Sequence, residues 1–335
     1  MRHPNLTEDE LVRAIRKVLS GEAPGVVVAV GDDAAVVDPG NQDVVLTSDM
    51  LVEGVHFDLP AVSGHDLGYK SITVSVSDIA AMGGSPRYGL VNLALPRAVE
   101  TAWVMEVYGG VRQAADEYGM AVVGGDTSRA DIHMVSVTAV GTVRRGKAVT
   151  RSGARAGDHL VVTGALGGAA GGLRLAMEPP HEVRGALGSA WGRELVQAYL
   201  SPAARVGEGE TLAQMGATAM IDLSDGLALD LSRLCAESGA GATLHVGKVP
   251  LAAGLEHLGR LLRVEPLELA LHGGEDYELL ACLPAAAVES ARDRITDRFR
   301  TPLTMIGEIT DRDLVAVHPD GSRVPLEPRG WDHFA

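Results

Sequence analysis

Apolar and polar positions follow one another along this chain in blocks that predict helices and strands in turn. Residues 65–82 combine a β-branched run with the length of a helix and a Gly83-Gly84 stop, and we predict a helix there. Residues 99–118 repeat apolar side chains at helical spacing. The other predicted elements are helix Thr7–Leu19, strands Val26–Val30, Val44–Thr47, 121–123, 133–144 and Leu160–Thr163, helix 167–177, a helix opening at Ser201-Pro202, strand 218–222, helix 227–237, strand Ala242–Val246, a helical stretch to 271, strand Tyr277–Leu283, helix 285–298 and short strands near 304 and 314.

This alternation predicts an α/β fold with mixed sheets, and the length predicts two domains. The chain has 335 residues, more than the roughly 100–200 of a typical domain. Residues 145–157 are basic, small and rich in glycine, which indicates a boundary. We therefore predict an N-terminal domain of residues 1–146 and a C-terminal domain of residues 147–335.

The charge of the chain limits the partners that it can bind. The formal net charge is −15, from 44 acidic and 29 basic residues, and the lysines are Lys17, Lys70, Lys147 and Lys248. Such a surface repels nucleic acid and anionic lipid. A polyanionic ligand would therefore need divalent cations or a local arginine cluster.

The cysteines and the apolar segments predict a cytoplasmic protein. Cys235 and Cys282 lie far apart in apolar surroundings, which predicts buried free thiols and suits a reducing compartment. The N-terminus lacks an apolar signal segment, and no run approaches the roughly 18 apolar residues of a membrane-spanning helix. We expect neither a membrane nor a nucleic acid as a partner.

Acidic residues recur in five short segments beside glycine or at the ends of apolar runs. The segments are Gly31-Asp32-Asp33, Thr47-Ser48-Asp49, Ser77-Asp78, Gly124-Gly125-Asp126-Thr127 and Asp222-Leu223-Ser224-Asp225-Gly226. A single aspartate after a strand is most often a helix cap or a turn former. Gathered together, these carboxylates would repel one another, and cations would remove that cost. Because Mg²⁺ prefers oxygen ligands and is often shared with phosphates, the pattern predicts several Mg²⁺ ions between phosphate-bearing ligands.

The common nucleotide-binding signatures are missing. Residues 141–148 resemble a Walker loop but carry Ala148 where a hydroxyl must meet Mg²⁺. The basic stretch that includes Arg151 is most often a solvated loop, although one arginine there can reach a phosphate. His56 is open to three interpretations, as a base, a metal ligand or a substrate contact, and no acid is placed to make it a base.

The order of these motifs resembles the thiamine-monophosphate kinase family. The resemblance rests on GDDAAVV, TSDMLVEGVHF, YKSITVSVSDIAAMGGSPRY, VVGGDTSR, TRSGARAGD, IDLSDGLALDL, HGGEDYELL and GWDHFA, which follow one another over nearly the whole chain. It implies ATP-dependent phosphorylation of thiamine monophosphate to thiamine diphosphate, the last step of that biosynthesis, by direct in-line transfer of the γ-phosphate. It also implies the two-domain fold of aminoimidazole ribonucleotide synthetase and a homodimer.

The resemblance also implies a role for each residue that matches a motif. The Mg²⁺ ligands would be Asp33, Thr47, Ser48, Asp49, Asp78, Asp126, Asp222 and Asp225, which would carry a metal-assisted reaction without a covalent nucleophile. The ATP contacts would be Gly125, Asp126, Arg151, Ser224 and Tyr108. The thiamine phosphate contacts would be His56, Glu275 and Trp331, and the motif alone does not distinguish Glu275 from Asp276. The N-terminal domain would bind Mg-ATP and form the dimer, and the C-terminal domain would complete the cleft.

Other functions share parts of this pattern. Another ATP-dependent enzyme of the aminoimidazole ribonucleotide synthetase superfamily would carry the same acidic motifs, although two such relatives have a terminal reactive cysteine that is not found here. A metal-dependent phosphohydrolase would use clustered ions to activate water and would release phosphate without a phosphorylated acceptor. A sensor would bind Mg-ATP without turnover.

Overall fold

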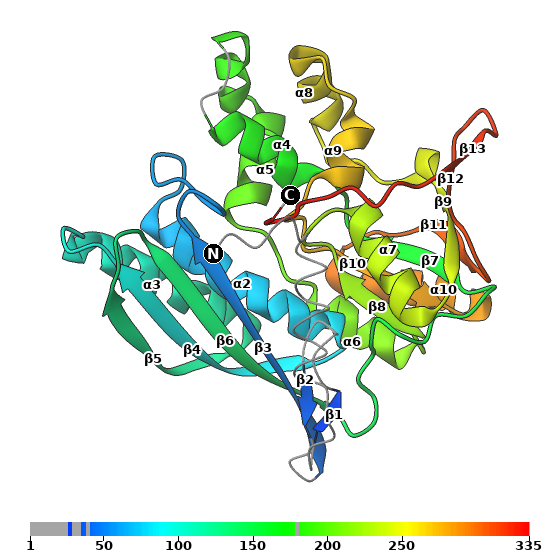
Figure 1. The fold of residues 1–335 in the computed structure, drawn as a ribbon, viewed down its shortest axis with the longest axis horizontal. Coiled ribbons are helices and arrows are strands. Elements are labelled where there is room, and N and C mark those ends of the chain that lie inside the picture. Colours follow the sequence, from blue (N-terminus) through cyan, green and yellow to red (C-terminus); the bar gives the residue numbers. More distant parts are fainter. Residues whose placement is uncertain (1–25, 29–34, 38–40, 178–180, 335) are drawn as a thin grey trace, which may run out of the picture.

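The computed structural model describes residues 26–28, 35–37, 41–177 and 181–334, in which two mixed sheets are packed with helices (Figure 1). The first sheet contains β1 (Val26–Val28), β2 (Ala35–Val37), β3 (Gln42–Val52), β4 (Ser85–Leu95), β5 (Ala121–Arg129) and β6 (Met134–Arg144), in the order β1-β2-β3-β6-β4-β5. Neighbouring strands are antiparallel, except that β4 and β5 are parallel. Helices α2 (Gly64–Ala81) and α3 (Thr101–Tyr118) belong to this half.

The second sheet follows along the chain. It contains β7 (His159–Thr163), β8 (Ala219–Asp222), β9 (Gly241–His245), β10 (Leu279–Leu283), β11 (Leu303–Thr310), β12 (Leu314–Val317) and β13 (Arg323–Pro325), in the order β13-β12-β9-β11-β7-β10-β8. Its helices are α4 (Gly168–Ala176), η1 (His181–Gly188), α5 (Ala190–Leu200), α6 (Val206–Gln214), α7 (Leu227–Ser238), η2 (Val246–Lys248), α8 (Leu255–Leu262), α9 (Pro266–His272), η3 (Ala285–Ala287) and α10 (Val288–Phe299). Mixed α/β structure in both halves confirms the predicted fold class.

The structure bears on two predictions, the state of the cysteines and the lack of a membrane-spanning helix. Cys235 and Cys282 are buried free thiols, as the apolar segments around them predicted. In the part of the chain that the structure describes, no helix is both long enough and apolar enough to span a membrane.

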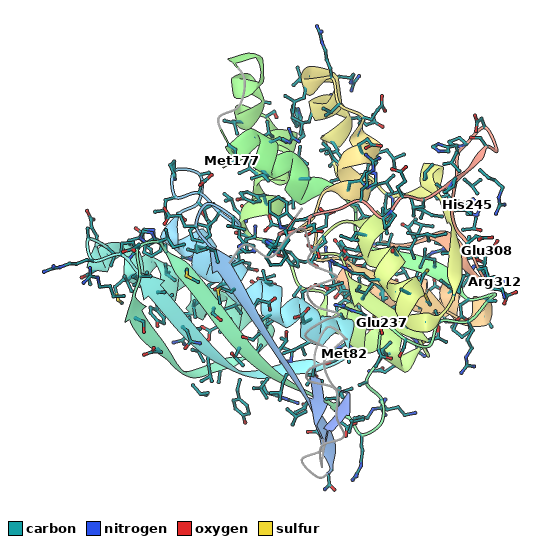
Figure 2. All side chains as sticks on the ribbon, viewed as in Figure 1. Met82, Met177, Glu237, His245, Glu308 and Arg312 are labelled. Atoms are coloured by element: carbon teal, nitrogen blue, oxygen red, sulfur yellow. The ribbon has the colours of Figure 1, made fainter. Side chains whose placement is uncertain are left out.

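Helix α2 lies between the two halves and is buried along almost its whole length. Ser63 caps it, because its Oγ accepts a hydrogen bond from the backbone N–H of Asp66 at 3.1 Å. Fifteen of the 18 helical residues are buried, so polar and apolar positions alike face protein. Ile72 packs in the core of the first sheet, whereas Ala80 joins a core of the second sheet. Met82, labelled in Figure 2, follows the helix between the halves and is fully buried.

The predicted end of strand Val44–Thr47 is wrong. Strand β3 continues to Val52, so Ser48 and Asp49 lie inside the strand rather than at its end. A carboxylate is tolerated there because Asp49 Oδ2 accepts a hydrogen bond from Ser75 Oγ at 2.7 Å. The acid that suggested a strand end therefore belongs to the strand itself.

Strand 121–123 is also longer than predicted. Strand β5 continues to Arg129, so Gly125 and Asp126 pair within the sheet and do not form a loop. Edge strands tolerate glycine and acids because one side of the backbone is not covered by another strand. The predicted helix Thr7–Leu19 and the segment Gly31-Asp32-Asp33 lie outside the described residues.

The helix predicted to open at Ser201-Pro202 begins instead at Val206. Ser201 is the C-terminal cap of α5, a helix that the sequence analysis did not predict. Proline is common just after a helix because it cannot continue one, and this signal was read as the start of the next helix. The two helices are therefore separated by a short loop.

Helices α2 and α3 approach closely at glycine positions, and this contact predicts a stability effect. A Cβ at Gly110 would lie 1.9 Å from the carbonyl oxygen of His65, whereas a Cβ at Gly109 would meet nothing closer than His65 Cδ2 at 3.6 Å. Gly110→Ala should lower the free energy of unfolding by about 1–3 kcal/mol, measured by urea denaturation. Gly109→Ala should be neutral or stabilising by up to about 1 kcal/mol. Equal losses in both variants would contradict the close packing.

Candidate functional site

Two acids meet where β3 faces α2. Thr47 Oγ1 donates a short hydrogen bond to Asp78 Oδ2, and Ser75 Oγ donates to Asp49 Oδ2 at 2.7 Å. Thr47 and Asp49 are two residues apart on one strand, so both side chains point to the face that α2 covers. The strand and the helix each contribute one acid and one hydroxyl to this contact.

A third acid comes from the second sheet. Asp222, the last residue of β8, is 3% exposed, and its Oδ2 accepts a hydrogen bond from Ser77 Oγ at 2.6 Å. A hydroxyl donor orients a carboxylate but does not neutralise it. Asp49, Asp78 and Asp222 are thus each held by a neutral hydroxyl, on the two sides of one helix.

The pKa of the Tyr277 hydroxyl is affected by several of the predicted site acids. Tyr277 is 4% exposed and packs in the core of the first sheet, although its chain segment belongs to the second half. Burial and nearby carboxylates raise its pKa well above the ordinary value. After burial, the contributing charges are those of Glu275, Asp49, Asp222 and Asp225, in decreasing order. The charges of four predicted site acids therefore act on one buried phenol.

Glu275 and Tyr277 both have a strained backbone conformation. Glu275 has φ 66° and Tyr277 has φ 49°, the left-handed region that side chains other than glycine rarely adopt. The Glu275 N–H donates to the carbonyl of Ser224 at 2.8 Å. Gly274 passes so close that a Cβ there would lie 2.3 Å from that same carbonyl. These backbone contacts fix Glu275 and Tyr277 beside the Asp222–Asp225 turn.

The two acids of the GGED motif have different environments. Asp276 accepts hydrogen bonds from the backbone N–H groups of Gly167 at 2.7 Å and Ala169 at 3.2 Å, at the start of α4, and burial raises its pKa to about 7. Glu275 instead forms an ion pair with Lys70 of α2 at 2.8 Å. Asp276 thus has a structural contact, while Glu275 faces the acids and α2.

Asp225 lies in a network at the start of α7. Arg233 donates a short hydrogen bond to Asp225 Oδ2 and another to Asp230 Oδ1 at 3.0 Å. Asp230 also accepts from the backbone N–H groups of Asp225 at 3.0 Å and Gly226 at 3.1 Å. The backbone carbonyl of Arg151, a predicted ATP contact, accepts a hydrogen bond from Ser238 Oγ at 2.9 Å, at the C-terminal end of α7. The network orients Asp225 and compensates part of its charge.

The C-terminal segment brings two of the predicted substrate contacts together. The backbone N–H of Trp331 donates to the carbonyl of Asp225 at 3.0 Å. The ring of His333 lies 5.7 Å from the Trp331 ring and 5.0 Å from the His56 ring, measured between centroids. Trp331 is 48% exposed, so about half of this residue is open to solvent. His56 and Trp331 thus both lie close to the His333 ring, and the Trp331 backbone contacts Asp225.

His56 is held as a neutral imidazole. The backbone N–H of Val52 donates to its Nδ1 at 3.0 Å. Burial lowers the pKa of His56 to about 4, and the charges of His333 and Lys70 act in the same direction. A base role requires a pKa near the working pH, so this environment favours a binding contact.

Two predicted ligands face the other side of the first sheet. Asp126 pairs with Asn92, which pairs with Ser136 and then Met50, so these side chains share one face. Asp49 is adjacent to Met50 and therefore faces the opposite side, toward α2. The Ser48 side chain, bonded to Thr138 Oγ1 at 3.1 Å, also lies on the Asp126 side. Within a single chain, the side chains of Ser48 and Asp126 therefore lie on the opposite face of the sheet from the acids that face α2.

The remaining predicted site residues lie in other parts of the fold or outside the described residues. Tyr108 of α3 packs partly buried against the core of the first sheet. Gly125 lies within β5 beside Asp126, and the backbone carbonyl of Ser224 already accepts from Glu275. Asp33 lies outside the described residues. The sequence analysis missed Lys70, Arg233 and Asp230, and the available signal was a charged residue inside an otherwise apolar helical run.

The acids around α2 fit a magnesium ion shared with phosphate. Within the described part of the chain, no three His, Cys, Asp or Glu side chains are arranged to hold one metal ion among themselves. Mg²⁺ is typically held by one or two carboxylates and completes its octahedron with water and substrate phosphates. The carboxylates of Asp49, Asp78 and Asp222 and the hydroxyl of Thr47 are oxygen donors of this kind.

Comparison with known proteins finds two family domains along the chain. Residues 31–143 match the family described as AIR synthase related protein, N-terminal domain, and residues 155–319 match its C-terminal domain. Thiamine-monophosphate kinase of Aquifex aeolicus is 36% identical over 334 residues, which cover 100% of both chains. The enzyme of that name from Escherichia coli K12 is 36% identical over 313 residues, 92% of each chain.

A solved structure agrees with these relatives. The structure of AaThiL complexed with AMPPCP and TMP is similar with a TM-score of 0.86 and 34% identity, over 100% of this chain and 99% of that one. Sequence and fold are therefore shared over the whole length rather than over one domain. The chain belongs to the thiamine-monophosphate kinase family.

Proposed function

We propose that this protein transfers the γ-phosphate of ATP to thiamine phosphate, which gives thiamine diphosphate and ADP. The relative of the same fold binds AMPPCP, an analogue of ATP, together with TMP. The observation that carries the proposal is the gathering of Asp49, Asp78 and Asp222 around α2, each held by a hydroxyl. Carboxylate oxygens that are oriented in this way are suited to bind Mg²⁺, and a bound cation attracts phosphate.

Phosphoryl transfer depends mainly on position and charge, so no protein nucleophile is needed. Mg²⁺ bound at Asp49, Asp78 and Asp222 would neutralise charge on the phosphate oxygens. Ser75 and Ser77 fix two of these carboxylates from a buried helix, which keeps the anionic groups of the two reactants in one place. Positioning is the main contribution of this chain.

The organic part of thiamine phosphate would bind beside the acids. His56, Glu275 and Trp331 come from three separate segments and lie around the Asp225 turn. The exposed ring of Trp331 offers an apolar surface for stacking on an aromatic ring. ATP would approach from the Arg151 and Arg233 side of Asp225, where guanidinium groups can contact phosphate oxygens.

The two halves would have different roles in this enzyme. Residues 1–146 would bind Mg-ATP and form the dimer, and residues 147–335 would complete the site with Asp222, Asp225 and Glu275. We place the reaction in the cytoplasm, where ATP is supplied and thiols such as those of Cys235 and Cys282 stay reduced.

A homodimer formed through the first sheet is part of the proposal. Helices α2 and α3 lie on one face of this sheet (Figure 1). On the opposite face, Met50, Tyr88 and Leu90 are between 41% and 53% exposed. Neighbouring exposed apolar side chains on a sheet face favour burial against a partner. A second copy would also cover the face that carries Ser48 and Asp126.

The purified protein should form thiamine diphosphate and ADP from thiamine phosphate and ATP only when Mg²⁺ or a similar ion is present. Asp78→Asn should lower kcat by about 100-fold or more, because a neutral amide is a weaker cation ligand. A coupled assay for ADP, with chromatography of the thiamine products, measures both. Asp131→Asn, an exposed acid elsewhere, is the control. Phosphate release without thiamine diphosphate would indicate a phosphohydrolase instead.

His56→Ala should raise the KM for thiamine phosphate by about fivefold to tenfold through the loss of one contact. Since the pKa of His56 is lowered to about 4, the imidazole is already neutral from about pH 5.5 to 8. The ratio of KM between variant and wild type should therefore stay constant over this range. Both proteins use the same substrate, so titration of thiamine phosphate does not change this ratio. A step in that ratio near pH 6.5 would show that His56 titrates there.

Sedimentation velocity should give twice the 34.9 kDa mass of one chain. Leu90→Lys places a charge in the proposed interface, so it should shift the protein toward monomer at micromolar concentration. Leu261→Lys, at a 46% exposed leucine of α8, should leave the mass unchanged. A monomeric wild type, or equal behaviour of both variants, would rule out this interface.

A further inference from the structure

Residues 326–334, the C-terminal segment, run from β13 past α9 toward the first half of the chain and carry Trp331 (Figure 1). They belong to no helix or strand, so backbone pairing within such an element does not hold them. A cavity of about 420 Å³ is lined by residues of α9, β12 and β13 and by Leu326, Glu327 and Arg329 of the segment. The segment is therefore incompletely packed on α9, and its position depends on particular contacts.

His272, the last residue of α9, contacts Arg329 with both ring nitrogens. Its Nδ1 lies 2.9 Å from the backbone carbonyl oxygen of Arg329, and its Nε2 lies 3.2 Å from Nη2 of the same residue. A carbonyl only accepts hydrogen bonds and a guanidinium only donates them. Both contacts therefore form together when Nδ1 carries the proton and Nε2 is unprotonated. A neutral imidazole in this tautomer fits the backbone and the side chain of Arg329 at once.

The ion pairs of Arg329 hold the segment less firmly than this contact. The guanidinium lies 3.5 Å from Glu268 Oε2 and 3.4 Å from Glu327 Oε2. All three side chains are more than half exposed, and exposed ion pairs contribute little to stability. The side chain of His272 is only 16% exposed, and its Nδ1 bonds the backbone. The hydrogen bond from His272 thus restrains the course of the chain itself.

The residues that follow Arg329 lie directly on the Asp225 turn. The backbone N–H of Trp331 donates to the carbonyl of Asp225 at 3.0 Å, and a Cβ at Gly330 would lie 2.4 Å from that carbonyl oxygen. The same turn packs on the end of α9, where a Cβ at Gly226 would lie 3.0 Å from the carbonyl carbon of His272. The end of α9, the Asp225 turn and the C-terminal segment therefore meet at one place.

We propose, on the basis of the proposed function, that His272 is a positioning residue, which holds the Arg329 carbonyl so that Trp331 lies on the Asp225 turn. Arg329 and Trp331 are two residues apart, so a restraint on one limits where the ring of the other can lie. A segment that is held before the substrate arrives does not have to be ordered on binding, which strengthens binding. His272 acts on thiamine phosphate through Trp331 and has no part in binding ATP.

Trypsin tests the contact directly, because it cleaves after arginine, at the Arg329 carbonyl that His272 holds. His272→Phe keeps a ring but removes both nitrogens, so release of residues 330–335 should be about fivefold to tenfold faster than in wild type, measured by mass spectrometry. His272→Asn should stay within about twofold of wild type, because its side-chain N–H can replace that of Nδ1. Cleavage at Arg312, an exposed arginine after β11, should stay unchanged in both variants.

The kinetics of the same variants test the link to the site. His272→Phe should raise the KM for thiamine phosphate by about fivefold, with kcat and the KM for ATP within about twofold of wild type. His272→Asn should restore the KM of the wild type. His257→Phe, at an exposed histidine of α8, is the matched control, and it should change neither the cleavage nor the kinetics.

Equal cleavage at Arg329 in His272→Phe and wild type, or an equal rise at Arg312, would overturn the inference. Faster cleavage at Arg329 with an unchanged KM for thiamine phosphate would also overturn it, and the proposed function would stand. A wild type that does not convert thiamine phosphate would instead overturn the proposed function, and this role of His272 with it.

Discussion

Burial of α2 between the two halves is the constraint on which the rest of this structure depends. A helix that contacts protein along most of its surface leaves few solvent-facing positions for its polar residues. Each of them must find a partner. Ser75 and Asp78 meet residues of β3, Ser77 meets Asp222 of β8, and Lys70 meets Glu275. The same requirement that stabilises the helix therefore gathers the groups of the site.

This arrangement explains how the protein can act without a nucleophile or a phosphate-binding loop. The hydroxyls of α2 orient carboxylates from both sheets. The glycine at position 274 lets the Glu275 loop contact the Ser224 turn. Tyr277 of the second half packs into the core of the first. Contacts between the two halves therefore also bring the groups of the site together.

The sequence predicted most elements of the fold, and its failures have physical causes. Helix 65–82 was predicted despite its β-branched run because its length and glycine stop outweigh local propensity. Asp49 was placed at a strand end because an acid inside a strand is unusual, and only the Ser75 contact explains it. Pro202 ends one helix rather than beginning the next. The position of Asp126 relative to Asp49 depends on strand register, which motifs do not encode.

The most direct test of the central claim is the anomalous scattering of Mn²⁺, used in place of Mg²⁺, in crystals grown with thiamine phosphate and a non-hydrolysable analogue of ATP. Peaks within coordination distance of Asp49, Asp78 and Asp222, between β3, α2 and β8, are the predicted result. Peaks confined to the opposite face of the first sheet, or absent from all three carboxylates, would show that α2 does not organise the site.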